Sequence, residues 1–405
     1  MQTIQVKFRR IQFLSYLFFF LFIGNLVLSC SDGKQEDDRY TEVLDIDNTV
    51  STKPMASDKY QVDSCVQLSA PEKIILTGDD DVLLKNGNIY ILNRVRGGKL
   101  LVFSGDGKFK FSLGQMGHAQ NELLSGPSDF SVDSAGNMYL FGQDCQKILV
   151  YNNKGQYMHT VNLAPEWPFT FTTTSDGDFM FAYRMVNDKI KDNTELAIFS
   201  QQLQCKRRLV PLKHSQLYSV NEHPFGHVGA HDISFIPNFS DRVFVLSSNT
   251  VKRIIKIKFK TGFVPSDKIS KMERDGDPKD LLLNKENVQN ICHYDENNQW
   301  IKVDYEWRNF RVHYLKHRKS GRVLLNGVSF FEGFFPANNA FLSGNHLVFL
   351  ITDNDISQMR NSHNVMGAKS WTECLNQSSS AIKAMIEGKI KAPALLFVSI
   401  PDPAE

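Results

Sequence analysis

Short turn signals recur along this chain, each set directly before a hydrophobic run. The first is Asn86-Gly87-Asn88, which precedes Ile89-Tyr90-Ile91-Leu92. Gly, Asn and Asp tolerate the positive φ that two-residue hairpin turns need to match the twist of their strands. Such turns begin at six positions: Asn86, Gly136, Gly177, Ser240, Asn297 and Gly344. Spacings of roughly 40–65 residues are typical of propeller blades, so the pattern predicts six similar β units.

A second hydrophobic run with its own turn follows each early hairpin. Leu100–Phe103 precedes Gly105, and an equivalent run, Ile148–Tyr151, comes 48 residues later. Another 48 residues lead to Leu196–Phe199. Each unit is therefore predicted to contain two hairpins and four strands. Strict alternation in Lys108-Phe109-Lys110-Phe111 indicates a half-exposed outer strand.

Segments near both ends of the chain look suited to closing a ring. Residues 65–68 form a short apolar run before the first unit, and residues 394–400 form another at the end. Pairing them in one blade would remove two exposed sheet edges. Residues 278–289 and 378–390 are expected to be short helical insertions. The predicted fold is all-β: a six-bladed β-propeller with short helical insertions, closed by N- and C-terminal strands in one blade.

The N-terminal segment has the layout of an export signal. Lys7, Arg9 and Arg10 precede an apolar stretch that ends in Val27-Leu28-Ser29-Cys30. A small residue followed by Cys resembles a bacterial lipobox, in which Cys30 is acylated and becomes the first residue of the mature protein. An uncleaved membrane anchor is the alternative. We expect a signal peptide over 1–29, a flexible acidic tether over 30–60 and the propeller over 61–405.

Composition excludes some partners and restricts the role of cysteine. The formal net charge is +2, of which three positive charges lie in the leader, so nucleic acid is not an expected partner. Besides Cys30 there are five cysteines, an odd number, and no CxxC spacing. Buried free thiols are expected, and no cofactor is indicated.

The first two units carry a more specific resemblance. Leu101-Val102-Phe103, Asp106-Gly107-Lys108-Phe109, Leu113-Gly114-Gln115-Met116-Gly117 and Asp129-Phe130-Ser131-Val132-Asp133 resemble the six-bladed β-propeller lipoproteins of Bacteroidetes, which are similar to NHL-type repeats. This resemblance implies a propeller fold and export, but no catalytic residue. The acidic residues after Cys30 are similar to surface-export signals of such lipoproteins. The implied location is the outer membrane, on the cell surface or alternatively facing the periplasm.

Candidate site residues come from the starts of the innermost strands, which surround the centre of a propeller. Counting back from each hairpin gives a mixed polar set: Asp129, Phe169, His231, Asp232, Asn290, Asn338 and Asn339. Carboxylate and amide oxygens suit Ca²⁺, as in lactonase-type six-bladed propellers. The alternative is that these residues cap strand ends and bind water.

One histidine-rich segment and the tryptophans leave further alternatives. His223, His227 and His231 recur at intervals of four, a Zn²⁺-binding spacing on a helix. Pro224 and the nearby glycines indicate a loop instead, either contacting a ligand or simply exposed. The four Trp residues suit sugar stacking or blade packing. The chain has no GxSxG elbow, P-loop or dinucleotide fingerprint.

These observations favour a lipid-anchored, non-enzymatic binding module at the cell envelope. Its ligand would be a peptide, a glycan or a partner protein, and the lipid anchor would attach it to the membrane. The alternative is a metal-assisted hydrolase or lyase with its site at the centre of the propeller, built from Asp129, His231, Asp232 and the Asn pair.

Overall fold

The computed structural model describes most of the chain beyond residue 40. The described residues are 40–49, 60–69, 75–78, 80–94, 98–185, 187, 193–212, 223–277, 279, 284–328, 340–366 and 380–400. The predicted signal peptide, Cys30 and the acidic residues after it lie outside these ranges. The strands and helices all belong to one compact unit, Glu42–Glu405.

Antiparallel sheets make up nearly all of this unit. Three four-stranded sheets follow one another along the chain: β3 (Asp81–Lys85), β4 (Asn88–Asn93), β5 (Lys99–Ser104) and β6 (Phe109–Leu113); β7 (Asp129–Val132), β8 (Met138–Gly142), β9 (Lys147–Tyr151) and β10 (Tyr157–Asn162); β11 (Thr170–Thr173), β12 (Phe179–Ala182), β13 (Thr194–Phe199) and β14 (Cys205–Pro211). A fourth combines β23 (Ala340–Ser343), β24 (His346–Ile351), β25 (Ala394–Ser399) and β2 (Gln61–Gln67).

The remaining sheet has nine strands and consists of two antiparallel runs of four plus one added strand. The first run is β15 (Phe225–Val228), β16 (Asp232–Phe235), β17 (Arg242–Ser247) and β18 (Thr250–Phe259). The second is β19 (Val288–Glu296), β20 (Trp300–Trp307), β21 (Phe310–His317) and β22 (Val323–Gly327). A single parallel pair, Val228 with Glu296, joins the two runs.

The added strand is β1 (Glu42–Ile46), which lies parallel to β18 on its outer edge. Leu44 and Ile46 are buried in the core that β18 shares with β20 and β21. The side chain of Asn48 donates to Thr261, and Asn326 at the end of β22 donates to the Asp47 carbonyl at 2.8 Å. The tether predicted over 30–60 is therefore interrupted, because residues 42–46 belong to a sheet.

Turn chemistry explains why the strands begin where they do. Asn86 and Gly87 have φ of 52° and 70°, as a type I′ hairpin requires, and they join β3 to β4. Five of the six turn signals join a first strand to a second in this way. The copy at Ser240 is the exception, because it lies between β16 and β17, and the first hairpin of that sheet turns at 229–231 instead.

Large side chains between adjacent sheets form the core. Tyr139 and Phe141 of β8 pack against Phe171, Phe179 and Phe181 of the next sheet, with ring centroids 5.7–6.3 Å apart along this series. Each buried aromatic contributes on the order of 1.5–3 kcal/mol relative to exposure. In the four-stranded sheets the second strand (β4, β8, β12 and β24) is mostly apolar on both faces because neighbouring sheets cover both.

The predicted pairing of the two chain ends is confirmed. Strand β2 pairs antiparallel with β25, with Val66 opposite Leu395. The Ser69 N–H donates to the Gly107 carbonyl at 2.9 Å, so the same segment also holds the sheet β3–β6. Residues from opposite ends of the chain thus complete one sheet.

Three helices lie in the described part of the chain. The helix predicted over 378–390 is found as α6 (Ser380–Ile386), which packs Ile382 and Met385 with β24 and β25. The prediction over 278–289 is described only in part: Lys279 is helical, whereas 284–287 are irregular and 288–289 begin β19. The helix of this insertion is α2 (Ser266–Asp275), which ends at Gly276 with φ of 65°. The helix α4 (Asp353–Met366) was not predicted.

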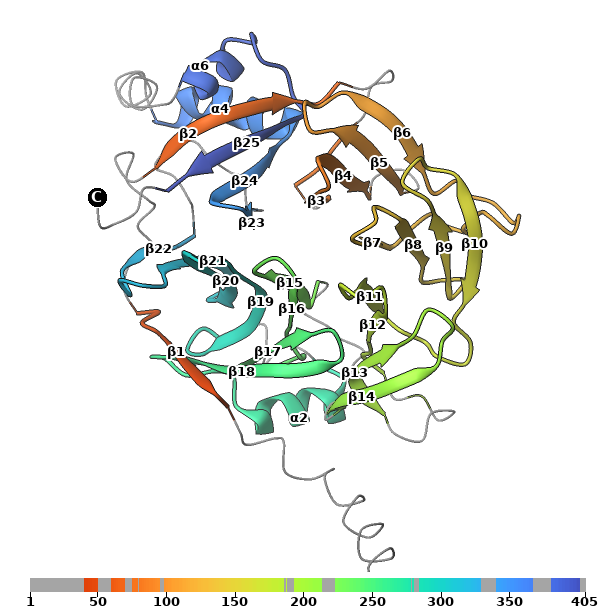
Figure 1. The fold of residues 1–405 in the computed structure, drawn as a ribbon. Coiled ribbons are helices and arrows are strands. Elements are labelled where there is room, and N and C mark those ends of the chain that lie inside the picture. Colours follow the sequence, from red (N-terminus) through yellow and green to blue (C-terminus); the bar gives the residue numbers. More distant parts are fainter. Residues whose placement is uncertain are drawn as a thin grey trace, which may run out of the picture. The chain divides into compact units, whose positions relative to one another are not determined.

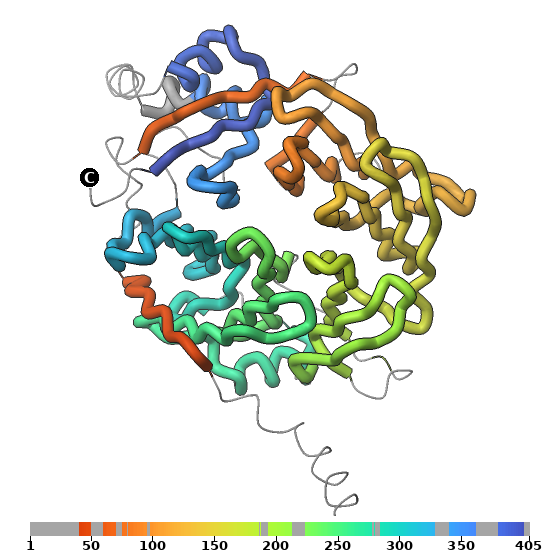
Figure 2. The backbone as a smooth tube through the Cα atoms, in the orientation of Figure 1, coloured from red at the N-terminus to blue at the C-terminus, as the bar shows by residue number. Residues whose placement is uncertain are grey.

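The sheets follow one another around a common centre, with β3, β7, β11, β15, β19 and β23 innermost (Figure 1; Figure 2 traces the same path). Contacts between neighbouring innermost strands place their starts at one end. The Lys85 ammonium at the end of β3 donates to the Val132 carbonyl at the end of β7, and the Ser131 hydroxyl contacts Thr173 of β11. Sheets arranged radially in this way form a β-propeller.

The two ends of this propeller differ in their connections. We call the end at which the innermost strands begin the loop end, and the opposite end the turn end. Between β2 and β25, every connection longer than five residues lies at the loop end, including those that carry α2, α4 and α6. At the turn end the strands are joined by two to five residues. Variable loops at one end of a rigid scaffold are where binding sites usually form.

Candidate functional site

Charged side chains meet at the loop end because several innermost strands begin there. Asp81 is the first residue of β3, Asp129 the first of β7 and Thr170 the first of β11. His223 lies two residues before β15. The parallel course of these strands brings residues far apart in sequence to the same level.

Asp129 is held by the neighbouring strand. Its carboxylate accepts hydrogen bonds from the Thr170 hydroxyl, from the Phe171 N–H at 3.3 Å and from its neighbour Phe130 N–H at 2.7 Å. Burial raises the pKa of Asp129, and the negative charge of Asp81 raises it further, against the opposing effects of the Thr170 bond and of the nearby His223. Within the described ranges, no basic side chain forms an ion pair with Asp129.

Asp81 bridges two basic side chains from different sheets. Arg94 Nη2 lies 2.5 Å from Asp81 Oδ2, and Arg94 Nη1 donates to the Ser128 carbonyl beside Asp129. His223 Nε2 lies 3.3 Å from Asp81 Oδ1, so a residue just before β15 reaches a carboxylate on β3. All three side chains are partly solvent-exposed, between 25% and 41%. We call Asp81 and Asp129 the acidic pair.

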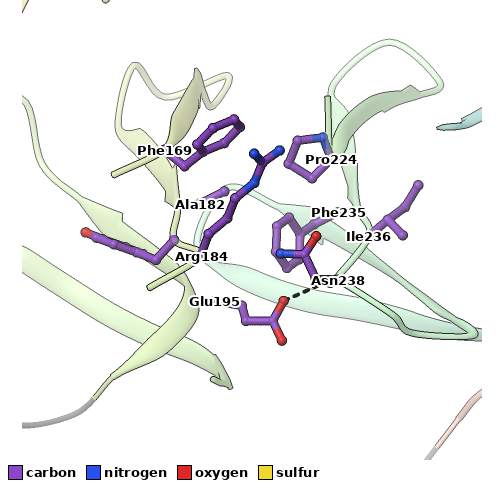
Figure 3. Close-up of a pocket in the computed structure, with 9 residues that line it drawn as sticks. Phe169, Ala182, Arg184, Glu195, Pro224, Phe235, Ile236 and Asn238 are labelled. Atoms are coloured by element: carbon purple, nitrogen blue, oxygen red, sulfur yellow. Dashed lines mark hydrogen bonds between the residues drawn. The ribbon is translucent and has the colours of Figure 1, made fainter. Parts of the chain in front are cut away.

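A small pocket adjoins the acidic pair. Residues on two neighbouring sheets line it, with Phe169 and Arg184 on one side and Pro224, Phe235 and Asn238 on the other (Figure 3). The Arg184 guanidinium carbon lies 3.0 Å from the centroid of the Phe169 ring, a cation–π contact. At the base, Glu195 accepts the Asn238 N–H at 2.8 Å. The pocket is continuous in sequence with the acidic pair, through Phe169–Thr170 and His223–Pro224.

A second charged cluster lies deeper, on β15, β19, β20 and β21. Asp295 accepts the His227 N–H at 2.9 Å and contacts His293 Nε2 at 2.9 Å. Burial alone would raise the pKa of Asp295, but His293, Lys302 and His227 together lower it. Burial lowers the pKa of His227, although solvent still reaches this side chain. A side chain that is surrounded by protein atoms and still in contact with solvent fits a position at the centre of the ring, where innermost strands of several sheets converge.

On the adjoining strands, Lys302 Nζ lies 2.5 Å from Asp304, which also contacts His313 Nδ1 at 2.8 Å. Lys302 and His313 are almost completely buried, at 0% and 1% exposure. Burial opposes ionisation of Asp304, yet the charge of Lys302 and the His313 contact lower its pKa. This triad is an internal charge network that lies away from open solvent.

The structure brings together only part of the predicted site. Asp129 and Phe169 both lie at the loop end, linked through Thr170. His231 and Asp232 do not, since they lie at the turn end, where Asp232 pairs with Lys252 at 3.0 Å. The prediction counted back from the turn at Ser240, which joins β16 to β17. It therefore selected the start of β16, although the innermost strand of this sheet is β15, which precedes His231.

The other predicted positions have different outcomes. Asn290 is fully buried within β19, where it donates to Cys292 Sγ at 3.8 Å, so it does not face solvent. Asn338 and Asn339 lie outside the described residues. The segment 223–232 is not wholly a loop, because 225–228 form β15. The described cysteines, Cys65, Cys145, Cys205 and Cys292, are free thiols, although Cys205 is exposed.

Sequence reasoning missed Asp81, Arg94 and the role of His223. Asp81 had a usable signal, since it precedes the first hairpin as Asp129 precedes the second. No sequence signal indicated that His223 contacts Asp81, because this contact joins residues that belong to separate sheets. Trp300 is buried in the core while Trp167 is 62% exposed, so packing and surface roles both occur.

Neither a membrane-spanning helix nor a metal-binding cluster occurs among the described residues. None of their helices is both long and apolar enough to cross a membrane. No group of three or more His, Cys, Asp or Glu side chains in these ranges is arranged to hold a metal ion.

Solved structures share this fold. A putative exported protein from Bacteroides fragilis superposes with a TM-score of 0.70 at 16% identity, covering 89% of this chain and 99% of its own. A member of the DUF4221 family from Bacteroides vulgatus gives 0.49 at 10% identity, covering 84% and 97%. Virginiamycin B lyase from Staphylococcus aureus gives 0.42 at 10% identity, covering 74% and 91%. At these identities the likeness concerns the fold, and it rests on the first of the three.

A family assignment comes from the sequence itself. No curated protein matches the chain. A family model described as a domain of unknown function, DUF4934, matches residues 41–382, which span the sheets from β1 to β24 and the helices between them. The chain therefore belongs to the DUF4934 family.

Proposed function

We propose that this protein is a binding module that receives a cationic group of its ligand at the acidic pair. The observation that carries the proposal is the environment of Asp129. Its carboxylate is held by hydrogen bonds, lies close to a second carboxylate, and has no ion-pair partner in the described part of the chain. An opposite charge placed there relieves the repulsion between the two carboxylates.

The local charge balance supports a cation. Among the described residues around the acidic pair and the pocket, Asp80, Asp81, Asp129 and Glu195 supply four carboxylates, against the guanidinium groups of Arg94 and Arg184 and the imidazole of His223. Asp80 accepts the Arg94 N–H at 2.8 Å, so it lies beside the ion pair of Arg94 with Asp81. Such a site attracts an ammonium or guanidinium group and disfavours an anion.

We further propose that the propeller has six blades and is attached to the outer membrane. The blade count follows if the two antiparallel runs of the nine-stranded sheet are taken as two blades. The anchor rests on Cys30 and the apolar stretch before it. An exported protein with the same fold supports a place in the cell envelope. We favour display on the cell surface, as expected from the acidic residues after Cys30.

Two short peptides test the proposal directly. Acetyl-Gly-Lys-Gly-amide and acetyl-Gly-Glu-Gly-amide differ only in the charge of one side chain. We expect saturation-transfer NMR at pH 7 to detect the lysine peptide with the full chain and not the glutamate peptide. The signal should disappear in Asp129→Asn and persist in Asp232→Asn, a matched carboxylate at the turn end. Equal signals from both peptides, or an unchanged signal in Asp129→Asn, would refute the assignment.

The metal-assisted hydrolase or lyase has no specific observation in its favour. Two of its expected residues, His231 and Asp232, lie at the turn end, and the pair Asn338 and Asn339 lies outside the described residues. Binding is therefore the function that the site supports best.

A further inference from the structure

Exposed large apolar side chains are concentrated at the loop end. Among the described residues, nine such side chains are exposed, and six of them lie at that end: Ile75, Met116, Leu124, Trp167, Met185 and Phe310. Of the other three, Met158 and Val323 lie on outer strands that start at the turn end, and Tyr40 precedes β1. Scattered exposed apolar residues are ordinary, but a bias toward one end is typical of an interaction surface.

Two of these residues adjoin the pocket. Trp167 is 62% exposed and lies two residues before Phe169; Met185 is 58% exposed and follows Arg184. The Arg184 guanidinium carbon lies 3.0 Å from the centroid of the Phe169 ring, so Trp167 and Met185 each lie within two residues of a contact that lines the pocket. Figure 3 shows the Arg184 side chain between Phe169 and Pro224.

Sequence neighbours of the pocket residues hold the acidic pair. Phe169 precedes Thr170, whose hydroxyl donates to Asp129. Pro224 lines the pocket and follows His223, which contacts Asp81. Residues that line the pocket are therefore next in sequence both to the residues that hold the acidic pair and to the exposed Met185, with Trp167 two positions away.

Resting on the proposed function, we propose that the ligand is a protein segment in which a Lys or Arg lies next to apolar side chains. Its cationic group would bind the acidic pair while an apolar neighbour packs on Trp167 and Met185. Trp is enriched among residues that dominate protein interfaces, and Met adapts to varied partners. A small amine uses only the carboxylates, and a neutral glycan can donate hydroxyl hydrogen bonds to them but cannot neutralise their charge. A peptide that carries a Lys or Arg beside apolar side chains uses both parts.

Three matched peptides separate the two parts of this surface. Acetyl-Leu-Lys-Phe-amide carries both features, acetyl-Leu-Gln-Phe-amide lacks the charge, and acetyl-Gly-Lys-Gly-amide lacks the apolar flanks. Dissociation constants for the full chain are measured by competition against a fluorescent form of the first peptide. We expect the first to bind at least about tenfold more tightly than either of the others, the ratio typical of losing one dominant contact.

Variants assign the difference to particular side chains. Trp167→Ala should weaken the first peptide about tenfold and leave acetyl-Gly-Lys-Gly-amide unchanged. Met185→Ala should weaken the first peptide in the same direction. Met158→Ala is the control, because Met158 is similarly exposed, at 53%, but lies on an outer strand near the turn end. Circular dichroism of each variant verifies that the fold is retained.

The outcomes distinguish this inference from the function on which it rests. If both lysine peptides bind equally well and Trp167→Ala has no effect, the peptide surface is wrong while the cation site stands. If the glutamine peptide binds as tightly as the lysine peptide, the cation site itself is wrong. Binding of a glucosamine oligomer that Trp167→Ala abolishes, with no binding of any peptide, would assign the surface to glycans and overturn the inference.

Discussion

Removing Asp304 from the buried triad should be among the most destabilising single substitutions in this protein. Lys302 Nζ lies 2.5 Å from Asp304 and is completely buried, and His313 contacts the other carboxylate oxygen at 2.8 Å. Asp304→Leu leaves the Lys302 ammonium inside the protein without its counterion. Replacing Lys302 by Met as well removes the charge that Asp304 balanced.

The expected magnitude reflects this burial. Breaking one side of a buried ion pair costs about 3–5 kcal/mol, whereas replacing both partners by apolar residues is often close to neutral. For a cooperative unit of about 360 residues, the unfolding entropy is about 0.75 kcal/mol/K, so Asp304→Leu should lower Tm by about 4–7 °C. The double variant Lys302→Met/Asp304→Leu should recover most of that loss.

Urea denaturation at pH 7, followed by circular dichroism, measures the four corners of this double-mutant cycle. Because the pKa of Asp304 is lowered, its contribution is present above the unfolded-state pKa and is lost as pH falls toward the folded-state pKa. The difference between wild type and Asp304→Leu should therefore shrink in acid. Asp47→Ala, which removes an exposed partner of Lys260, is the control and should leave the midpoint unchanged.

Two results would refute this reasoning. A single variant as stable as wild type would mean that Lys302 is solvated or finds another counterion. Single effects that add up without coupling would mean that Lys302 and Asp304 do not stabilise each other.

Three further predictions concern the acidic pair, the anchor and the closing sheet. The pKa of Asp129 is raised, so its ionised form destabilises the folded state, and Asp129→Asn should be more stable than wild type at pH 7. Thermal melts at several pH values should show this difference vanish below the unfolded-state pKa, and greater stability of wild type at pH 7 would contradict the prediction. Cys30→Ala should move the protein from the membrane pellet to the supernatant on fractionation, and continued pelleting would exclude the lipobox. Deleting residues 394–400 removes β25 from between β24 and β2, so the cooperative unfolding transition should be lost; an unchanged Tm would contradict the closure.

The fold was predictable where its signals are local. Asn86 and Gly87 are residue types that tolerate the positive φ of their turn. The apolar run that follows each early hairpin recurs after 48 residues, which indicated a repeated set of strands. The pairing of β2 with β25 was predictable as well, because an unpaired apolar run at each end needs a partner. In the sheet β15–β18 the first hairpin turns at 229–231, where a single Gly lies within a histidine-rich stretch. The turn signal at Ser240 is stronger, so the sequence analysis assigned the first hairpin of this sheet to Ser240.

The site was less predictable because its contacts are tertiary. Asp129 could be found from its position before a hairpin, but its bond to Thr170 depends on how two sheets align. The contact between His223 and Asp81 joins strands separated by two whole sheets along the chain. The helix α2 did have a signal, Pro265 before it and Gly276 after it, but only burial of Ile269 and Met272 shows that it packs on the propeller.

The sharing of one sheet by segments far apart in sequence has a consequence for how the chain folds as it is made. Strand β25 holds β2 in place, and about 330 residues separate the two in sequence. Bringing such distant segments together costs on the order of 5 kcal/mol in chain entropy, before any contact compensates. During synthesis β2 is made early and stays unpaired until β25, far later in the sequence, has followed. Protection from proteases is therefore expected to arrive late and all at once, when β25 docks.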